Sequence, residues 1–118
     1  MRIDTDVAWL AGLIEGEGSF MVKRVRPDKE WWGLTIQIGM TDQDVIDRVA
    51  ALCPGGHINV DAANESRRTK PLYRWRMTNR PLVVELAQDV LPYLGGRRSA
   101  EALNLLWTAK YASPRSTQ

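Results

Sequence analysis

The spacing of the hydrophobic residues changes at residue 19, from the period of a helix to the period of a strand. Val7, Leu10 and Ile14 fall on one face of a helix. From Ser19 onward apolar and polar residues alternate, most regularly over residues 33–40, which predicts strands with one buried and one polar face. A helix that leads directly into such strands restricts the chain to folds in which helices pack on a sheet.

The second part of the chain repeats this order of elements. Residues 41–44 are typical of a capping box, which predicts a helix that ends near Leu52. Strands are expected at 57–61 and 73–78. The polar and basic stretch between them, residues 62–70, is expected to form a loop.

Two further helices complete the predicted fold. Asn79 is expected to cap the third helix, and the glycine pair 95–96 separates it from a last helix whose apolar face includes Leu103 and Trp107. The pattern predicts an α+β fold of the αββαββα type, with an antiparallel four-stranded sheet and helices on one face. We expect residues 1–112 to form a single domain and residues 113–118 to form a disordered tail.

Composition narrows the class of protein further. The lone cysteine, Cys53, cannot form an intrachain disulfide, which fits a reducing compartment. The apolar runs are too short to span a bilayer, and the first residues contain no apolar signal core. We therefore expect an intracellular protein with no membrane partner.

The net charge of +2 is small, but it is unevenly distributed. The two predicted strand pairs, residues 19–40 and 57–80, hold ten basic and four acidic residues, so they carry +6 while the rest of the chain carries −4. A basic sheet on a mildly acidic body is typical of a surface that faces phosphates. A solvated sheet face would show the same charges, so charge alone does not identify a nucleic-acid binder.

The nine residues 10–18 carry the most specific signal in the chain. They read Leu-Ala-Gly-Leu-Ile-Glu-Gly-Glu-Gly, which resembles the LAGLIDADG motif of homing endonucleases with Glu at both acidic positions and Gly for the second Ala. The Ser-Phe pair at 19–20, the helix-strand-strand order and the Pro-Tyr-Leu stretch at 92–94 before a basic pair are also similar to the family. The resemblance covers the chain to about residue 110 and implies a site-specific DNA endonuclease.

Two glycines of the motif indicate a partner for the first helix. Gly12 and Gly16 are four residues apart, so they lie on one helix face. A glycine in mid-helix costs about 1 kcal/mol relative to alanine, so Gly12 indicates close packing against another helix. The family packs two such helices side by side, and a single motif then implies a homodimer with a two-fold symmetric interface. The expected interface residues are Ala8, Gly12, Glu15 and Gly16, with Glu15 in a structural rather than a catalytic role.

The second acid of the motif is the candidate catalytic residue. Glu17 lies at the negative end of the helix dipole, and two copies across a two-fold axis would repel each other unless cations lay between them. Carboxylate oxygens suit Mg²⁺, which Mn²⁺ or Ca²⁺ can replace for binding. The resemblance implies that backbone oxygens near Gly16 help to hold the metal. By resemblance, Glu17 binds the metal that drives phosphodiester hydrolysis. A basic residue near the family's active site corresponds to Arg97 or Arg98, both of which also fit a surface helix start, and we favour Arg97 as the group that stabilises transition-state charge.

Strand parity assigns side chains to the uncovered face of the sheet, which is expected to enter the major groove of double-stranded DNA. The side chains predicted to face the bases are Ser19, Met21, Lys23, Thr35, Gln37, His57, Asn59, Arg74 and Arg76. Those predicted to hold phosphates are Arg24, Arg26, Arg67, Arg68 and Lys70.

The leading hypothesis is a homodimeric, Mg²⁺-dependent endonuclease that cuts a long, near-palindromic DNA site, of the kind encoded in introns, inteins or phage genomes. Where the family often has a glutamine that positions solvent, this chain has Met40. Met40 favours an alternative, a DNA-binding regulator of the same family with weak or no cleavage. A third hypothesis, an RNA maturase, finds no support, because the aromatic signature of the common RNA-binding modules is missing from the sequence.

Overall fold

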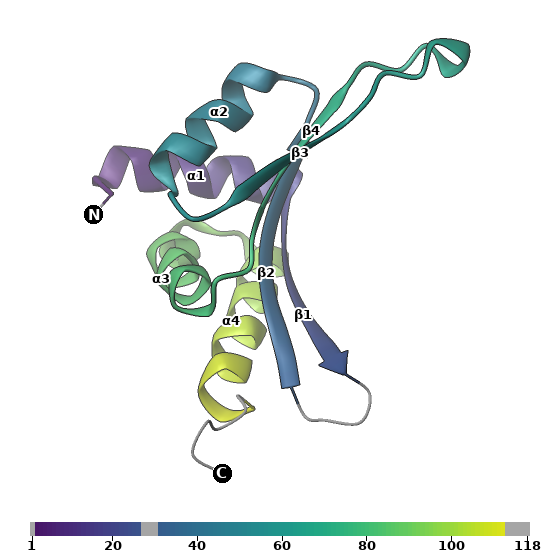
Figure 1. Ribbon diagram of the computed structural model, residues 1–118. Helices are drawn as coiled ribbons and strands as arrows, with labels where there is room; N and C mark the ends of the chain where they lie inside the picture. The colour runs from purple at the N-terminus through teal and green to yellow at the C-terminus, as the bar shows by residue number, and fades with distance from the viewer. Residues whose placement is uncertain (1, 27–30, 113–118) are drawn as a thin grey trace.

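The computed structural model describes residues 2–26 and 31–112 as a curved sheet with helices packed on one face (Figure 1). The predicted tail, 113–118, lies outside the described residues. In chain order the elements are α1 (Asp4–Glu17), β1 (Gly18–Arg26), β2 (Trp31–Met40), α2 (Gln43–Leu52), β3 (His57–Asp61), the 3₁₀ turn η1 (Glu65–Arg67), β4 (Leu72–Met77), α3 (Arg80–Val90), η2 (Leu91–Tyr93) and α4 (Gly96–Tyr111). The strands form one antiparallel sheet in the order β1-β2-β4-β3. The predicted α+β class and element order are confirmed.

The core lies between the sheet and the four helices, as the hydrophobic periods predict. Leu10 and Ile14 of α1 are fully buried, as are Ile36 and Ile38 of β2 and Trp75 of β4. Burying one such aliphatic side chain contributes about 1.5–3 kcal/mol. Truncating Ile38 to alanine would cost roughly 2–5 kcal/mol, because its neighbours could not close the space.

The join between α1 and β1 has no loop. Helix α1 ends at Glu17 and strand β1 begins at Gly18. A Cβ on Gly18 would lie 2.8 Å from the Cα of Ile14, so only glycine lets the chain turn this closely against its own helix. As a result Glu17 occupies the last position of the helix, and the first residues of the sheet follow immediately.

One helix end matches the sequence prediction and another differs from it. The Asn79 side chain caps α3 by accepting a hydrogen bond from the Leu82 N–H at 3.2 Å, as predicted. The N-cap of α2 is Asp42, which forms no side-chain cap bond, so the predicted capping box is wrong. Helix α2 is therefore held in place by its buried Ile46 and Val49 rather than by its cap.

Helix α4 presents a different face to the core from the one the sequence suggested. Leu103 and Trp107 are 53% and 58% exposed, whereas Ala102, Leu105 and Thr108 are buried. The Thr108 hydroxyl donates to the Asn104 carbonyl oxygen at 2.8 Å, so it can be buried without an unsatisfied polar group. Helix α4 packs mainly against β1 and α3.

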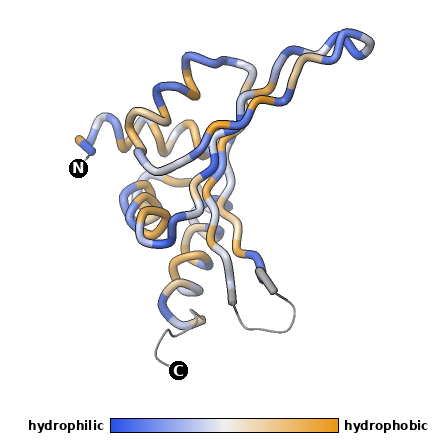
Figure 2. Tube along the Cα trace, in the orientation of Figure 1, coloured by the Kyte–Doolittle hydropathy of each residue, from blue (hydrophilic) through white to orange (hydrophobic). Residues whose placement is uncertain are grey.

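The β3–β4 hairpin extends past the helices, away from the β1–β2 hairpin (Figure 1). Hydrophobic residues continue along it beyond the helical layer (Figure 2). Ile58 and Val60 alternate as expected, but they are 37% and 56% exposed because no helix covers this part of the sheet. Every residue of β3 is therefore exposed, whereas Trp75 and Met77 of β4 remain buried in the core.

Candidate active site and nucleic-acid interface

The face of the sheet opposite the helices, here called the open face, carries the side chains that strand parity predicted. The pairing Ser19 with Gln37, Gln37 with Arg76, and Arg76 with His57 places one residue of each strand in a single row across the sheet. A second row contains Gly39, Arg74 and Asn59. Met21, Thr35 and Lys23 continue the open face toward the β1–β2 hairpin. The nine predicted base-facing residues therefore share one surface.

Two side chains in the first row are joined. The Arg76 Nε and Nη2 atoms both donate to Oε1 of Gln37, at 3.2 and 2.8 Å. Both residues line a shallow hollow of about 480 Å³ together with Met21, Lys23 and Thr35. The contact orders a long, flexible arginine on an otherwise open surface and leaves the amide nitrogen of Gln37 and the Nη1 of Arg76 available to a ligand.

Further basic residues lie on the β3–β4 hairpin, beyond the second row. Arg74 pairs with Asp61 at 3.1 Å, and Arg67, Arg68 and Lys70 are exposed at the tip of the β3–β4 hairpin. Arg68 adopts a left-handed conformation with φ 54, immediately after the 3₁₀ turn that Asn64 caps. This turn chemistry gives the tip a defined shape and places three cations at the far end of the sheet.

The other two predicted phosphate contacts lie near the β1–β2 hairpin. The guanidinium of Arg24 lies 5.7 Å from the centre of the Trp32 ring, so β1 and β2 hold it in a cation–π contact. The side chain of Arg26 lies outside the described part of the structure.

The motif helix exposes a strip of small residues that ends at an acid. Ala8, Gly12 and Gly16 are exposed, and so is Glu17. A Cβ added at Gly12 or Gly16 would meet no atom of the described chain within 4 Å. No residue in the described part of the chain therefore requires either glycine to be small, unlike Gly18.

Glu15 binds its own chain instead of facing outward. Its Oε1 accepts a hydrogen bond from the Gly95 N–H at 2.7 Å, at the start of α4. Its carbonyl oxygen accepts from Arg98 Nε at 3.4 Å. These contacts join the end of α1 to the start of α4.

The two candidate arginines have different environments. Arg98 is half-buried, and its Nη1 donates to both carboxylate oxygens of Glu101, at 3.0 and 2.9 Å. Arg97 is exposed and has no hydrogen bond or ion pair with any residue that the structure describes. Arg97 is thus the one of the two whose charge is available to a ligand.

A divalent cation would find one side-chain ligand here. No group of three or more His, Cys, Asp or Glu side chains that could hold a metal comes together within residues 2–26 and 31–112. Glu17 offers one exposed carboxylate at a negative helix end, beside backbone oxygens of the last turn. Such oxygen ligands fit Mg²⁺, which keeps several waters and takes its remaining ligands from phosphates or from a second carboxylate.

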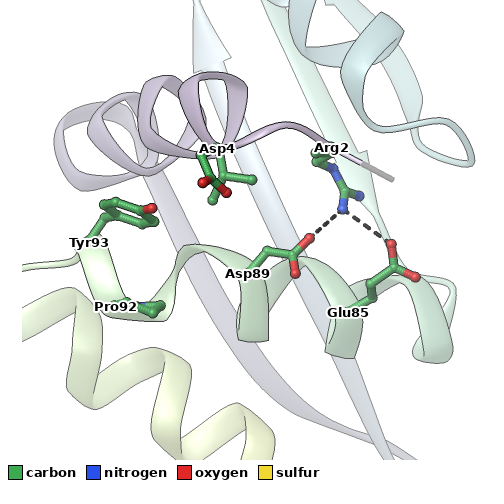
Figure 3. A pocket seen from close by; sticks show the side chains of 7 residues that line it. Arg2, Asp4, Glu85, Asp89, Pro92 and Tyr93 are labelled. Carbon is green, nitrogen blue, oxygen red and sulfur yellow. Dashed lines mark hydrogen bonds and ion pairs between the residues drawn. The ribbon is translucent and has the colours of Figure 1, made fainter.

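The opposite end of α1 is fixed by a different group of ion pairs (Figure 3). Arg2 Nη1 lies 2.8 Å from Asp89 and 3.2 Å from Glu85 on α3, and Arg2 Nε donates to the Leu52 carbonyl oxygen at 3.2 Å. A hollow of about 520 Å³ beside them is also lined by Asp4 and Tyr93. The acids here are matched by a buried arginine, so we assign this cluster to stability.

Comparison with solved structures identifies the fold. The chain superposes on the homing endonuclease I-CvuI in complex with its target with a TM-score of 0.74 and 16% identity, covering 92% of this chain and 68% of that one. The LAGLIDADG meganuclease I-AabMI bound to uncleaved DNA matches with a TM-score of 0.70 and 20% identity, over 88% of this chain and 35% of that chain. The group I intron-encoded endonuclease I-CeuI complexed with DNA matches with a TM-score of 0.70 and 13% identity, over 93% and 56%.

The chain has the fold of the LAGLIDADG homing endonucleases. The resemblance stated from residues 10–18 is thereby confirmed for the fold. No protein-family model and no curated protein matches the sequence. The chain spans about two thirds of the I-CvuI chain but only about a third of I-AabMI.

Within the LAGLIDADG fold, sequence reasoning missed the contacts of Arg98 with Glu101 and with the motif. Their only sequence signal is the three-residue spacing of a helical ion pair, which is common on helix surfaces.

Met40 lies on the same face of β2 as Ile38 and packs partly against the core, so it presents no polar group to the open face. No helix within the described residues is long and apolar enough to cross a membrane.

Proposed function

We propose that the protein is a homodimeric, divalent-metal-dependent endonuclease that cuts a long, near-palindromic double-stranded DNA site. One observation carries the proposal: the exposed strip of small residues on α1 ends at an exposed acid that directly precedes an open, basic sheet face. The strip supports pairing of two chains, the acid supports metal binding, and the open face supports DNA binding. The solved structures of this fold include complexes with DNA.

The space beside α1 supports the proposed dimer. Ala8, Gly12 and Gly16 are exposed, and no described residue requires either glycine to be small. A second α1 crossing at this strip would bury the helix backbones against each other. A two-fold axis there brings the two Glu17 carboxylates to the same place, with Glu15 supporting the helix end from its own chain.

The chemistry rests on Glu17 and Arg97. Paired Glu17 side chains and Gly16 carbonyl oxygens would hold Mg²⁺, with Mn²⁺ or Ca²⁺ able to replace it for binding. A bound divalent ion supplies an activated water and neutralises charge on the phosphate and the leaving oxygen. Arg97, whose charge is free at the start of α4, would stabilise the charge that develops on the phosphate.

In the proposed complex, side chains of the open face would contact DNA bases, and the other basic residues would contact DNA phosphates. Side chains of the two cross-strand rows can reach base edges in the major groove, where Arg suits guanine and Gln or Asn suits adenine. Arg24 and Arg26 at one end, and Arg67, Arg68 and Lys70 at the other, would hold the phosphate backbone. The β1–β2 hairpin that carries Arg24 and the β3–β4 hairpin that carries the other three extend away from each other (Figure 1).

The alternative, a DNA-binding protein that does not cleave, is favoured by Met40. A methionine packed toward the core cannot orient a water as an amide can. One solved complex of I-CvuI, with the I-CreI target in the presence of Mg, holds DNA that is not cleaved. Binding and cleavage therefore need separate measurements.

The test begins with a random DNA library from which bound sites and cut sites are selected separately with Mg²⁺. On the selected site, the E17Q variant should bind as the wild type does and lose cleavage by a factor of 10³ or more, since the metal ligand is gone. The E85Q variant, which changes an exposed acid on α3, is the matched control and should cleave normally. Cleavage by E17Q at the wild-type rate would refute the catalytic role of Glu17, and binding without cleavage by the wild type would establish the alternative.

A further inference from the structure

The backbone on both sides of Glu17 is held by side chains from outside the motif. Two residues before it, the Glu15 carbonyl oxygen accepts from Arg98 Nε at 3.4 Å. Three residues after it, the Phe20 N–H donates to Oε1 of Glu101 at 3.4 Å. Arg98 and Glu101 are themselves joined by two contacts, at 3.0 and 2.9 Å. One ion pair on α4 thus touches the end of α1 and the start of β1.

This arrangement matters because Glu17 has no partner of its own. Its side chain is exposed and has no hydrogen bond or ion pair with any described residue. The position of its carboxylate is therefore set by the backbone that carries it. Because β1 is an edge strand, N–H groups on its outer side have no strand partner, and Glu101 satisfies one of them.

The ion pair is sheltered enough to act as a fixed support. The side chains of Arg98 and Glu101 are only 12% and 30% exposed. Glu15 adds a second contact to the same helix start, through Gly95 at 2.7 Å. Helix α4 therefore contacts the acid-bearing join from both sides.

We propose that Arg98 and Glu101 are positioning residues that fix the helix-to-strand join and so hold the Glu17 carboxylate in place for cleavage. This inference rests on the proposed function. Neither side chain acts on the phosphate, because each is engaged with the other and with the backbone. A displacement of about 1 Å at a reacting group can cost a factor of 10² in rate, so loosening the join should be visible in the cleavage step.

Arg2 provides a matched control at the other end of the same helix. It is also sheltered, at 8% exposure, and it also contacts acids on another helix and a backbone carbonyl oxygen. Its loss should destabilise the protein about as much as the loss of Arg98. It lies far along α1 from Glu17, so it should not alter the cleavage step.

The experiment compares R98M, R98K and R2M in the full chain on the selected DNA site, well below the melting temperature of each variant. Single-turnover cleavage with saturating protein separates the cleavage step from DNA binding. R98M should cleave ten to a hundred times more slowly than the wild type with DNA affinity changed less than twofold. R98K, which can still contact Glu101, should recover part of the rate, and R2M should cleave at the wild-type rate.

Amide hydrogen exchange gives a readout that needs no cleavage. R98M should accelerate exchange of the Phe20 amide relative to amides of β2, and R2M should not. If the wild type cuts no DNA, the proposed function fails, while exchange at Phe20 still decides whether Arg98 holds the join. An equal loss of rate in R98M and R2M, full activity of R98M, R98K as slow as R98M, or unchanged exchange at Phe20 would each overturn the positioning role.

Discussion

Replacing Gly12 with alanine should stabilise a single chain and weaken the pairing of two. Gly12 lies inside α1, and a Cβ there meets nothing within 4 Å, so an isolated chain gains the helix propensity of alanine, about 1 kcal/mol. With roughly 2.1 cal/mol/K of unfolding entropy per residue, this corresponds to a rise in Tm of about 4 °C for a chain of this size. If a second α1 packs on this strip, the two added methyl groups overpack the contact instead, at a cost of about 1–3 kcal/mol.

The two effects are separable by concentration. Sedimentation of G12A should show a dissociation constant about 5- to 150-fold higher than that of the wild type, since each factor of ten corresponds to about 1.4 kcal/mol. In the dilute, dissociated protein the variant should melt at a higher temperature than the wild type. G96A is the control, because Gly96 begins α4 and its added Cβ also meets open space.

The reasoning fails on either of two results. The wild type could sediment as a single chain even when it is bound to its selected DNA. Alternatively, G12A could raise Tm by about 4 °C and leave the association constant unchanged, which would mean that nothing approaches this face of α1.

Three further changes test other parts of the structure. Replacing Gln37 and Arg76 with alanine, singly and together, should show a coupling of about 0.5–3 kcal/mol in the affinity for the selected DNA, because the two side chains are hydrogen-bonded. If the two single losses of affinity add up to the loss in the double variant, the two side chains act independently. The N79A variant should lose about 1 kcal/mol in denaturant unfolding, since its cap bond to the Leu82 N–H is lost; an unchanged midpoint would contradict this. Burial raises the pKa of the Cys53 thiol, so the unfolded chain ionises first and wild-type stability should fall as pH rises above about 8.5, a fall that C53A should lack.

The sheet was predictable because its information is local. Alternation over residues 33–40 assigns Thr35 and Gln37 to one face and Ile36 and Ile38 to the other, and a period of two leaves no other arrangement. The cap at Asn79 was also predictable, because the bond is made three residues along the chain. The rows across the sheet, such as the contact of Gln37 with Arg76, depend on strand register and became visible only in the structure.

The buried face of helix α4 could not be predicted from the local sequence pattern. Its sequence contains two possible apolar faces, and hydrophobicity favours the one with Leu103 and Trp107. The structure buries the face with Ala102, Leu105 and Thr108, and the small side chains of Ala102 and Thr108 allow a close approach of the helix. The contacts of Arg98 follow from that approach, so no pattern in the sequence could have assigned them to the join after Glu17.

The missing loop between α1 and β1 also constrains how the specificity of this protein can evolve. Ser19 follows Glu17 by two residues, so the proposed metal-binding acid and the first side chain of the open face are mechanically one unit. Successive side chains on one face of a strand are about 6.6 Å apart, which spans roughly two base pairs of DNA. Inserting a single residue after Gly18 would turn every open-face side chain of β1 toward the hydrophobic core, so the open face can change by exchange of side chains but not by changes in length at this join.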